Sequence, residues 1–167
     1  MRFPSQVRAL VAHEPPLQQL TTEAQRQTAR LPELYRQHGM AALRVFAASI
    51  GADQGDAAPA GPGSPATVGN AKYFLEYDAP AVARYHLDIT TLSRSPARVV
   101  VAAGQASRQY FPYQCAAALA SLLGTDLVEF PGGHGAYAGN DPQAFGSVLQ
   151  DVLLEAGNHP HDRAGRC

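Results

Sequence analysis

Several features that define common protein classes are scarce in this sequence. The 167 residues include two cysteines, Cys115 and Cys167, which are too few for a disulfide framework or a cysteine-rich zinc site. Thirteen basic and fourteen acidic residues give a net charge of −1, so no general positive field exists to hold nucleic acid or anionic lipid. No apolar run approaches the roughly 20 residues of a membrane span. We therefore expect a cytoplasmic protein with free thiols, no nucleic-acid partner and no membrane partner.

The histidines do not follow a metal-binding spacing. None of them lies in an H-E-x-x-H pattern, and none accompanies a pair of cysteines. We expect no metal site and no cofactor. The six histidines are His13, His38, His86, His134, His159 and His161.

The order of the apolar segments predicts an α/β fold. A short apolar run at 7–12 ends at two prolines, which is typical of a buried strand. In the last third of the chain, strand-like runs at 98–104 and 126–130 alternate with helical stretches at 113–123 and 142–155. Strands and helices that alternate through short connections favour parallel pairing with right-handed crossovers. The prediction is a small parallel sheet of about three strands with flanking helices.

The residues between the first two predicted strands follow a helical pattern. From 17 to 50, apolar residues recur at intervals of three and four, which predicts helices with one apolar face. Pro32 and Gly39 interrupt this pattern, so we expect two or three helices there. A second helical region extends from 71 to about 92, with a break near Pro80.

Composition divides the chain further. Residues 51–69 are rich in Gly, Pro, Ala and Ser without an apolar period, which predicts a disordered linker. We assign residues 1–16 and 93–156 to the core, 17–92 to a helical lid insertion, and 157–167 to a flexible tail.

Candidate reactive residues follow the predicted strands. In open α/β sheets, ligands bind at the carboxyl ends of the strands, which here are His13 and Glu14, the turn 104–107, and the loop 132–135. His134 is the strongest single candidate, because an imidazole in a glycine-rich loop can act as a general base near neutral pH. The alternative is a loop histidine with no role, and position alone leaves both interpretations open.

Two residues at the end of the first strand have different expected roles. The carboxylate of Glu14 either orients a catalytic base or pairs with arginine or backbone amides at the mouth of the insertion. His13 points to the opposite face of the sheet if the strand persists. We expect His13 to pack against a helix of the lid insertion rather than to bind metal.

Aromatic residues of the insertion outline an apolar pocket in general terms. Such residues belong to a core more often than to a recognition surface, so a role in substrate binding is one of two interpretations. The candidates are Tyr73, Phe74, Tyr77 and Tyr85.

These segments together resemble the C-terminal half of an α/β-hydrolase. The Phe-Pro-Gly-Gly-His loop at 130–134 is the most specific part, Ala-His-Glu-Pro-Pro at 12–16 is less specific, and the strand at 99–103 is weak alone. The resemblance covers nearly the whole chain apart from the linker and the tail. It implies a partial α/β-hydrolase fold in which His134 is the catalytic histidine.

The resemblance also implies an unusual catalytic acid. The family usually places the acid in a Gly-x-x-Asp turn, but residues 104–107 read Gly-Gln-Ala-Ser and include no carboxylate. Some members place the acid directly after the strand that precedes the lid, and Glu14 occupies that position. Glu14 is therefore the implied acid that orients His134, with Ser107 as a hydrogen-bonding substitute at the usual acid turn.

We name no nucleophile. The family's Gly-x-Ser-x-Gly elbow precedes the strand that begins here at Val7, so we expect the chain to hold neither the elbow nor the oxyanion-hole amides. Ser64 lies in the predicted linker, and Ser107 lacks the glycines of the elbow. Cys115 lies on an apolar helix, where a buried and inert thiol is the simpler interpretation.

Three functions are consistent with these residues. In the first, the chain supplies the base, the acid and the lid of a hydrolase for a small apolar ester or amide, and the nucleophile comes from elsewhere. In the second, the chain is a non-catalytic truncated remnant that binds a small molecule or a partner chain. A cofactor-free lyase or isomerase with His134 as base rests on analogy of fold alone. Because the first strand lacks an outer neighbour, we expect a second copy or a complementing chain there.

Overall fold

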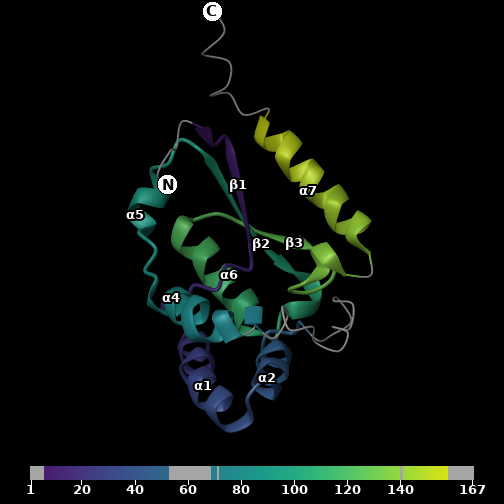
Figure 1. Cartoon of the computed structure of the whole chain (residues 1–167). Helices are drawn as coiled ribbons and strands as arrows, with labels where there is room; N and C mark the ends of the chain where they lie inside the picture. The colour runs from purple at the N-terminus through teal and green to yellow at the C-terminus, as the bar shows by residue number, and fades with distance from the viewer. Residues whose placement is uncertain (1–5, 53–68, 71, 140, 158–167) are drawn as a thin grey trace, which may run out of the picture.

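A parallel three-stranded sheet forms the centre of the computed structural model (Figure 1). The strands are β1 (Ala9–His13), β2 (Arg98–Gly104) and β3 (Leu127–Phe130), in the order β1-β2-β3. The predicted α/β fold with three parallel strands is confirmed, although β1 begins two residues later than the predicted run. The structure describes residues 6–52, 69–70, 72–139 and 141–157.

The central strand β2 is covered on both faces. Val101 and Ala103 pack with residues of α6 (Phe111–Leu123), whereas Val100 and Ala102 pack with residues of α7 (Pro142–Gly157). This alternation explains the unbroken apolar run of the strand, because a parallel strand between two helical layers buries both of its faces.

The insertion between β1 and β2 is helical. Figure 1 shows α1, α2 and α4 at the end of the molecule to which β1 leads, beyond the carboxyl end of that strand. The elements of the insertion are the 3-10 turn η2 (Gln18–Leu20), α1 (Thr22–His38), α2 (Ala41–Ser49), the π-helical turn η3 (Phe74–Asp78), α4 (Ala79–Arg84) and α5 (Ile89–Ser93).

The predicted interruption at Pro32 is wrong. Pro32 lies inside α1, which continues until Gly39 ends it with a positive φ of 54°. A proline inside a helix costs about 3 kcal/mol. Leu31 offsets part of this cost, because its side chain is buried against Leu75 and Ala79 of the second helical region.

The predicted break near Pro80 is also misplaced. Pro80 is the second residue of α4, which follows the π-helical turn η3 without a break, so the helical backbone passes from π to α geometry just before this proline instead of ending there. The chain leaves the helix at Tyr85, which is extended with ψ 130°, and it becomes helical again at Ile89.

The predicted linker and tail lie mostly outside the described residues. Gly51 and Ala52 form a turn after α2, and Gly69 is helical, while 53–68 and 158–167 are not described. Ser64 and Cys167 fall in those segments. Within the described part, no helix is long and apolar enough to cross a membrane.

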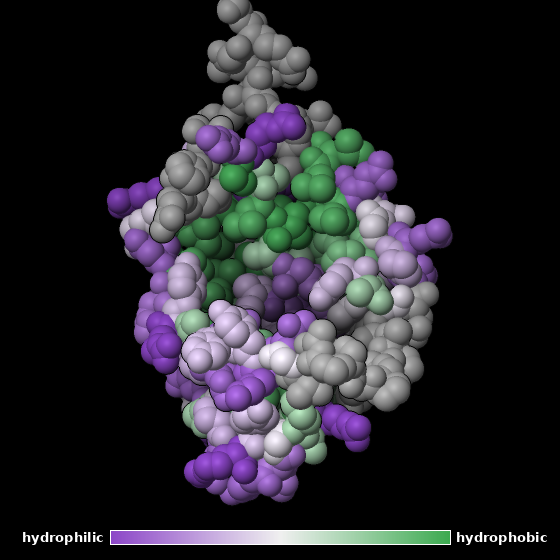
Figure 2. All heavy atoms as spheres, in the orientation of Figure 1, coloured by the Kyte–Doolittle hydropathy of each residue, from purple (hydrophilic) through white to green (hydrophobic). Residues whose placement is uncertain are grey.

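The outer edge of β1 has no neighbouring strand among the described residues. Leu10 of β1 and both Leu153 and Leu154 of α7 are exposed large apolar side chains. Figure 2 shows that hydrophobic residues gather around β1 and the adjoining part of α7 in this view. An open edge of this kind is a template for pairing with another chain.

Candidate active site

Glu14 follows the last residue of β1 in an unusual backbone conformation. Its φ is +44°, in the left-handed region that favours glycine, and its amide still donates to the carbonyl of Ala102 at 2.9 Å. A left-handed backbone costs a non-glycine residue on the order of 1–3 kcal/mol. The residue is 1% exposed, so this local conformation places a carboxylate inside the protein.

Three groups donate hydrogen bonds to the Glu14 carboxylate. The amide of Gly104 donates to Oε1 at 2.8 Å, the Ser107 hydroxyl contacts the same oxygen, and Nδ1 of His134 lies 2.8 Å from Oε2. Burial alone would raise the pKa of Glu14, but the hydrogen bonds from His134, Ser107 and Gly104 hold it below its ordinary value. The carboxylate is therefore ionised at neutral pH.

His134 is oriented by this carboxylate. An ionised carboxylate accepts hydrogen bonds only, so Nδ1 of His134 carries the proton that they share. In the neutral imidazole this leaves Nε2 unprotonated and able to accept a proton. The side chain is 29% exposed, and it also lines a cavity.

The backbone at Gly104, the last residue of β2, lies in close contact with the backbone of the loop that carries His134. A Cβ atom at Gly104 would lie 2.6 Å from the carbonyl oxygen of Gly132 and 2.8 Å from the Cα of Gly133. The amide of Ala106 donates to the same Gly132 oxygen at 2.9 Å. Only glycine at position 104 lets the two segments meet in this way.

The cavity beside His134 is mainly apolar. Its volume is about 260 Å³, and His134 is its one ionisable lining residue. Of the four aromatic candidates, Phe74 lines this cavity, whereas Tyr73, Tyr77 and Tyr85 are more than half exposed. The lining residues are Pro16, Gln18, Thr28, Phe46, Ile50, Phe74, Ala79, Val82, Phe111, Pro112 and His134.

The expected packing of His13 against the insertion is wrong. Its ring packs edge-on against Phe130 at 5.6 Å and against Phe145 of α7 at 5.1 Å between centroids. The cause is the side-chain alternation of β1, which directs His13 toward the face covered by α7. Nε2 of His13 has no hydrogen-bond partner in the described part of the chain, and burial lowers the pKa of this imidazole.

No nucleophile is hydrogen-bonded to His134 among the described residues. The hydrogen bond of His134 there is to Glu14 and not to a hydroxyl or thiol, and the hydroxyl of Ser107 is engaged by Glu14. Cys115 is fully buried, its thiol donates to the carbonyl of Leu17 at 3.4 Å, and burial raises its pKa. No group of three or more His, Cys, Asp or Glu residues in the described segments could hold a metal ion.

Sequence reasoning did not find the backbone amide that holds Glu14 or the residues of the insertion that line the cavity. It named Glu14, Ser107 and His134, which lie together, but not the Gly104 amide or the cavity-lining Thr28. The glycine that ends the β-branched run is a usable signal for a close approach, whereas a threonine inside a helical stretch carries no such signal.

One curated protein is similar to nearly all of this chain. The uncharacterized hydrolase YraK of Bacillus subtilis strain 168 is 33% identical over 165 residues, which cover 95% of this chain and 59% of the relative. The chain thus spans 59% of the length of the relative that it matches. No protein-family model matches the chain, and no solved structure matches it. The similarity supports a hydrolase relationship.

Proposed function

We propose that this chain belongs to the α/β-hydrolase superfamily and supplies the base, the orienting acid and the substrate cavity for hydrolysis of a small apolar ester or amide. The observation that carries this proposal is the 2.8 Å contact between Nδ1 of His134 and the buried Glu14 carboxylate, beside an apolar cavity. A fully buried carboxylate held by three donors in a left-handed backbone has few purely structural explanations.

His134 is the general base of the proposed reaction. Its Nε2 takes the proton of an attacking hydroxyl while the hydroxyl oxygen forms a bond to the carbonyl carbon of the substrate. The imidazolium then gives this proton to the departing alcohol or amine as the bond to the carbonyl carbon breaks, which leaves the acyl group on the attacking oxygen. Water attacks this ester in the same way: His134 takes a proton from the water and returns it to the departing hydroxyl, and the acid is released. Glu14 stabilises the positive charge of the imidazolium, and Ser107 positions Glu14.

The helical insertion acts as a lid in this proposal. It contributes most of the cavity wall that faces His134, including Thr28, Phe46 and Phe74. Apolar walls exclude water from the reacting bond and strengthen electrostatic interactions there.

The attacking hydroxyl comes from a complementing chain in this proposal. The relative is longer than this chain, which spans 59% of it. Hydrolysis of p-nitrophenyl butyrate is therefore measured with this chain alone and together with a polypeptide that corresponds to the remainder of the relative. We expect turnover in the mixture, and a loss of about 10²–10⁴-fold on His134→Ala.

An exposed histidine provides the matched control for this assay. His38 ends α1 and lines neither described cavity, so His38→Ala should leave turnover unchanged. Absence of turnover under both conditions, or turnover that survives His134→Ala, contradicts the proposed function.

The tautomer of His134 gives a test that does not need turnover. Nitrogen-15 NMR of the labelled chain should show that the neutral ring of His134 carries its proton on Nδ1 and not on Nε2, because Glu14 accepts from Nδ1. Glu14→Gln should reduce the population of this tautomer. A ring that stays protonated at Nε2 in the wild-type chain is incompatible with the proposed base.

The open edge of β1 favours a second candidate function, in which the chain binds a partner chain without catalysis. The proposed occupant is a complementing chain that adds a strand beside Leu10. Light scattering should then detect a complex with the remainder of the relative, weakened by Leu10→Arg. Leu122→Arg, on the exposed surface of α6, is the control. If light scattering shows a stable dimer of this chain alone, the strand beside β1 comes from a second copy and not from a complementing chain. If this chain stays monomeric in every mixture, the binding function is excluded.

A further inference from the structure

A second cavity lies between α1 and α4, next to the cavity of His134. Its volume is about 340 Å³. Most of its lining is apolar, and we call it the polar cavity only for the side chains of Gln18, Thr28 and Arg84. The lining residues are Gln18, Gln25, Thr28, Ala29, Leu31, Pro32, Leu75, Ala79, Pro80, Ala83 and Arg84. The two cavities share the lining residues Gln18, Thr28 and Ala79, so they adjoin each other.

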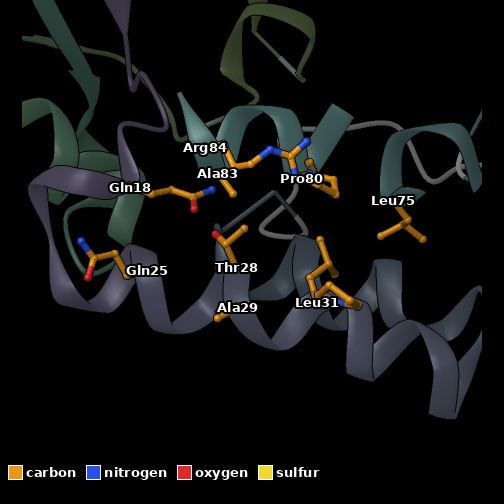
Figure 3. Close-up of a pocket in the computed structure, with 11 residues that line it drawn as sticks. Gln18, Gln25, Thr28, Ala29, Leu31, Leu75, Pro80, Ala83 and Arg84 are labelled. Carbon is orange, nitrogen blue, oxygen red and sulfur yellow. The ribbon is translucent and has the colours of Figure 1, made fainter. Parts of the chain in front are cut away.

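The amide of Gln18 faces the cavity and makes no hydrogen bond within the described part of the chain. Gln18 is 7% exposed, yet among the described residues the fully buried side-chain atom without a partner is Nε2 of His13 and not an atom of Gln18. Figure 3 shows this side chain among the residues that line the polar cavity. The amide donors of Gln18 are therefore free to bind a ligand group in the cavity.

The charge of the polar cavity is positive. Arg84 is its one charged lining residue, and no carboxylate lines it. Within the described segments, the guanidinium of Arg84 makes no ion pair, unlike that of Arg108, which forms two hydrogen bonds to Glu129. Figure 3 shows the Arg84 side chain along the α4 wall of the cavity.

We propose that the polar cavity binds a carboxylate of the substrate through Arg84 and Gln18. A guanidinium matches a carboxylate with two parallel hydrogen bonds, and one guanidinium neutralises one carboxylate but not a phosphate dianion. The Gln18 amide supplies further donors. The Thr28 hydroxyl donates to the carbonyl of Ala24, so it has no proton left for the ligand.

This inference rests on the proposed function and names its substrate class. The substrate is a monoester or monoamide of an apolar dicarboxylic acid. Its carboxylate occupies the polar cavity, its apolar chain passes Gln18 and Ala79, and its ester or amide group reaches His134.

Binding of octanoate and octanamide to the full chain, measured by isothermal titration calorimetry, tests the inference. The two probes share an apolar chain and differ in charge. We expect octanoate to bind on the order of tenfold more tightly, because a charge-assisted hydrogen bond is about twice as strong as a neutral one. Arg84→Gln should abolish this preference, and Gln18→Glu should weaken octanoate more than octanamide.

Arg44→Gln is the matched control, since it makes the same change of charge at an exposed residue of α2 that lines neither cavity. Thermal melting confirms that each variant is folded. Equal affinity for the two probes, equal loss in Arg44→Gln, or no binding of either probe overturns the inference.

The outcome is separable from that of the proposed function. His134→Ala should leave the preference for octanoate intact, because His134 does not line the polar cavity. A protein that hydrolyses a neutral ester through His134 but shows no preference for octanoate retains the proposed function and loses only this inference.

Discussion

The surroundings of Glu14 and the polar cavity both enclose polar side chains, but their hydrogen bonding differs. Glu14 receives hydrogen bonds from Gly104, Ser107 and His134, whereas the amide of Gln18 has no partner in the described part of the chain. A satisfied buried network holds its geometry without a ligand, whereas a side chain that faces a cavity without a protein partner keeps its donors free. The first region therefore positions a side chain, and the second is the region in which we propose that a ligand binds.

The largest expected effect comes from removal of the carboxylate on which the first region depends. Glu14→Ala leaves the buried Gly104 amide without its acceptor and removes the partner of His134, while the Ser107 hydroxyl can still donate to the carbonyl of Gly104 at 2.9 Å. We expect the free energy of unfolding in urea to fall by about 3 kcal/mol. Glu23→Ala, at an exposed ion pair with Arg26, should change it by less than about 1 kcal/mol. Equal effects of the two substitutions would remove the distinction between the two regions.

The second largest effect is expected from a change in the backbone contact between Gly104 and the loop of His134. Gly104→Ala places a Cβ 2.6 Å from the carbonyl oxygen of Gly132, so the loop must move. We expect a loss of about 1–3 kcal/mol in the free energy of unfolding. Gly146→Ala, inside α7 with no atom within 4 Å of the new Cβ, should stabilise by about 0.5–1 kcal/mol. Thermal melting distinguishes the two variants by the sign of the change.

Ser107 tests a single hydrogen bond to the carboxylate. Ser107→Ala should cost about 1 kcal/mol in urea unfolding and raise the pKa of Glu14, because one stabilising donor is lost. Carbon-13 NMR of the carboxyl groups follows this pKa. Ser147→Ala, whose exposed hydroxyl donates to Gln143 within α7, should leave the pKa of Glu14 unchanged. An unchanged pKa in Ser107→Ala would mean that the hydroxyl does not position the carboxylate.

The smallest expected effect concerns pH. Burial lowers the pKa of His13 from its ordinary 6.5, so the folded protein resists protonation of this imidazole. Its contribution to stability is present above pH 6.5 and is lost as the pH falls toward the lowered pKa. Glu14 also has a lowered pKa, and its contribution disappears at more acidic pH, below its ordinary 4.5.

His13→Phe should separate these two contributions. It extends the cluster of Phe130 and Phe145 and removes the titrating ring. We expect the free energy of unfolding, measured in urea at a series of pH values, to fall less in this variant than in the wild type just below pH 6.5. Below pH 4.5, where Glu14 becomes protonated, it should fall in both proteins. An identical pH profile in this variant would show that His13 does not contribute.

Sequence reasoning succeeded where the physical signal is local. The β-branched run at 98–104 predicted the central strand, because a strand buried on both faces needs apolar side chains at successive positions. The rule that ligands bind at the carboxyl ends of parallel strands selected Glu14, Ser107 and His134, which the structure brings together. Their catalytic roles stay predictions.

Sequence reasoning failed where packing overrode a local preference. Pro32 does not end its helix, because Leu31 is buried against residues more than forty positions away along the chain. His13 packs against α7 instead of the insertion, since its direction depends on which helix covers that face of β1. Neither outcome is visible in a window of neighbouring residues.

The sequence by itself determined the kinds of elements and their parallel pairing, because apolar periodicity and glycine or proline boundaries act over a few residues. Only the tertiary structure decided the site, since Glu14 and His134 lie 120 positions apart and meet through the sheet register and the contact at Gly104. It also decided that Gln18 and Arg84 line one cavity, because a cavity is formed by the packing of helices and not by any one of them.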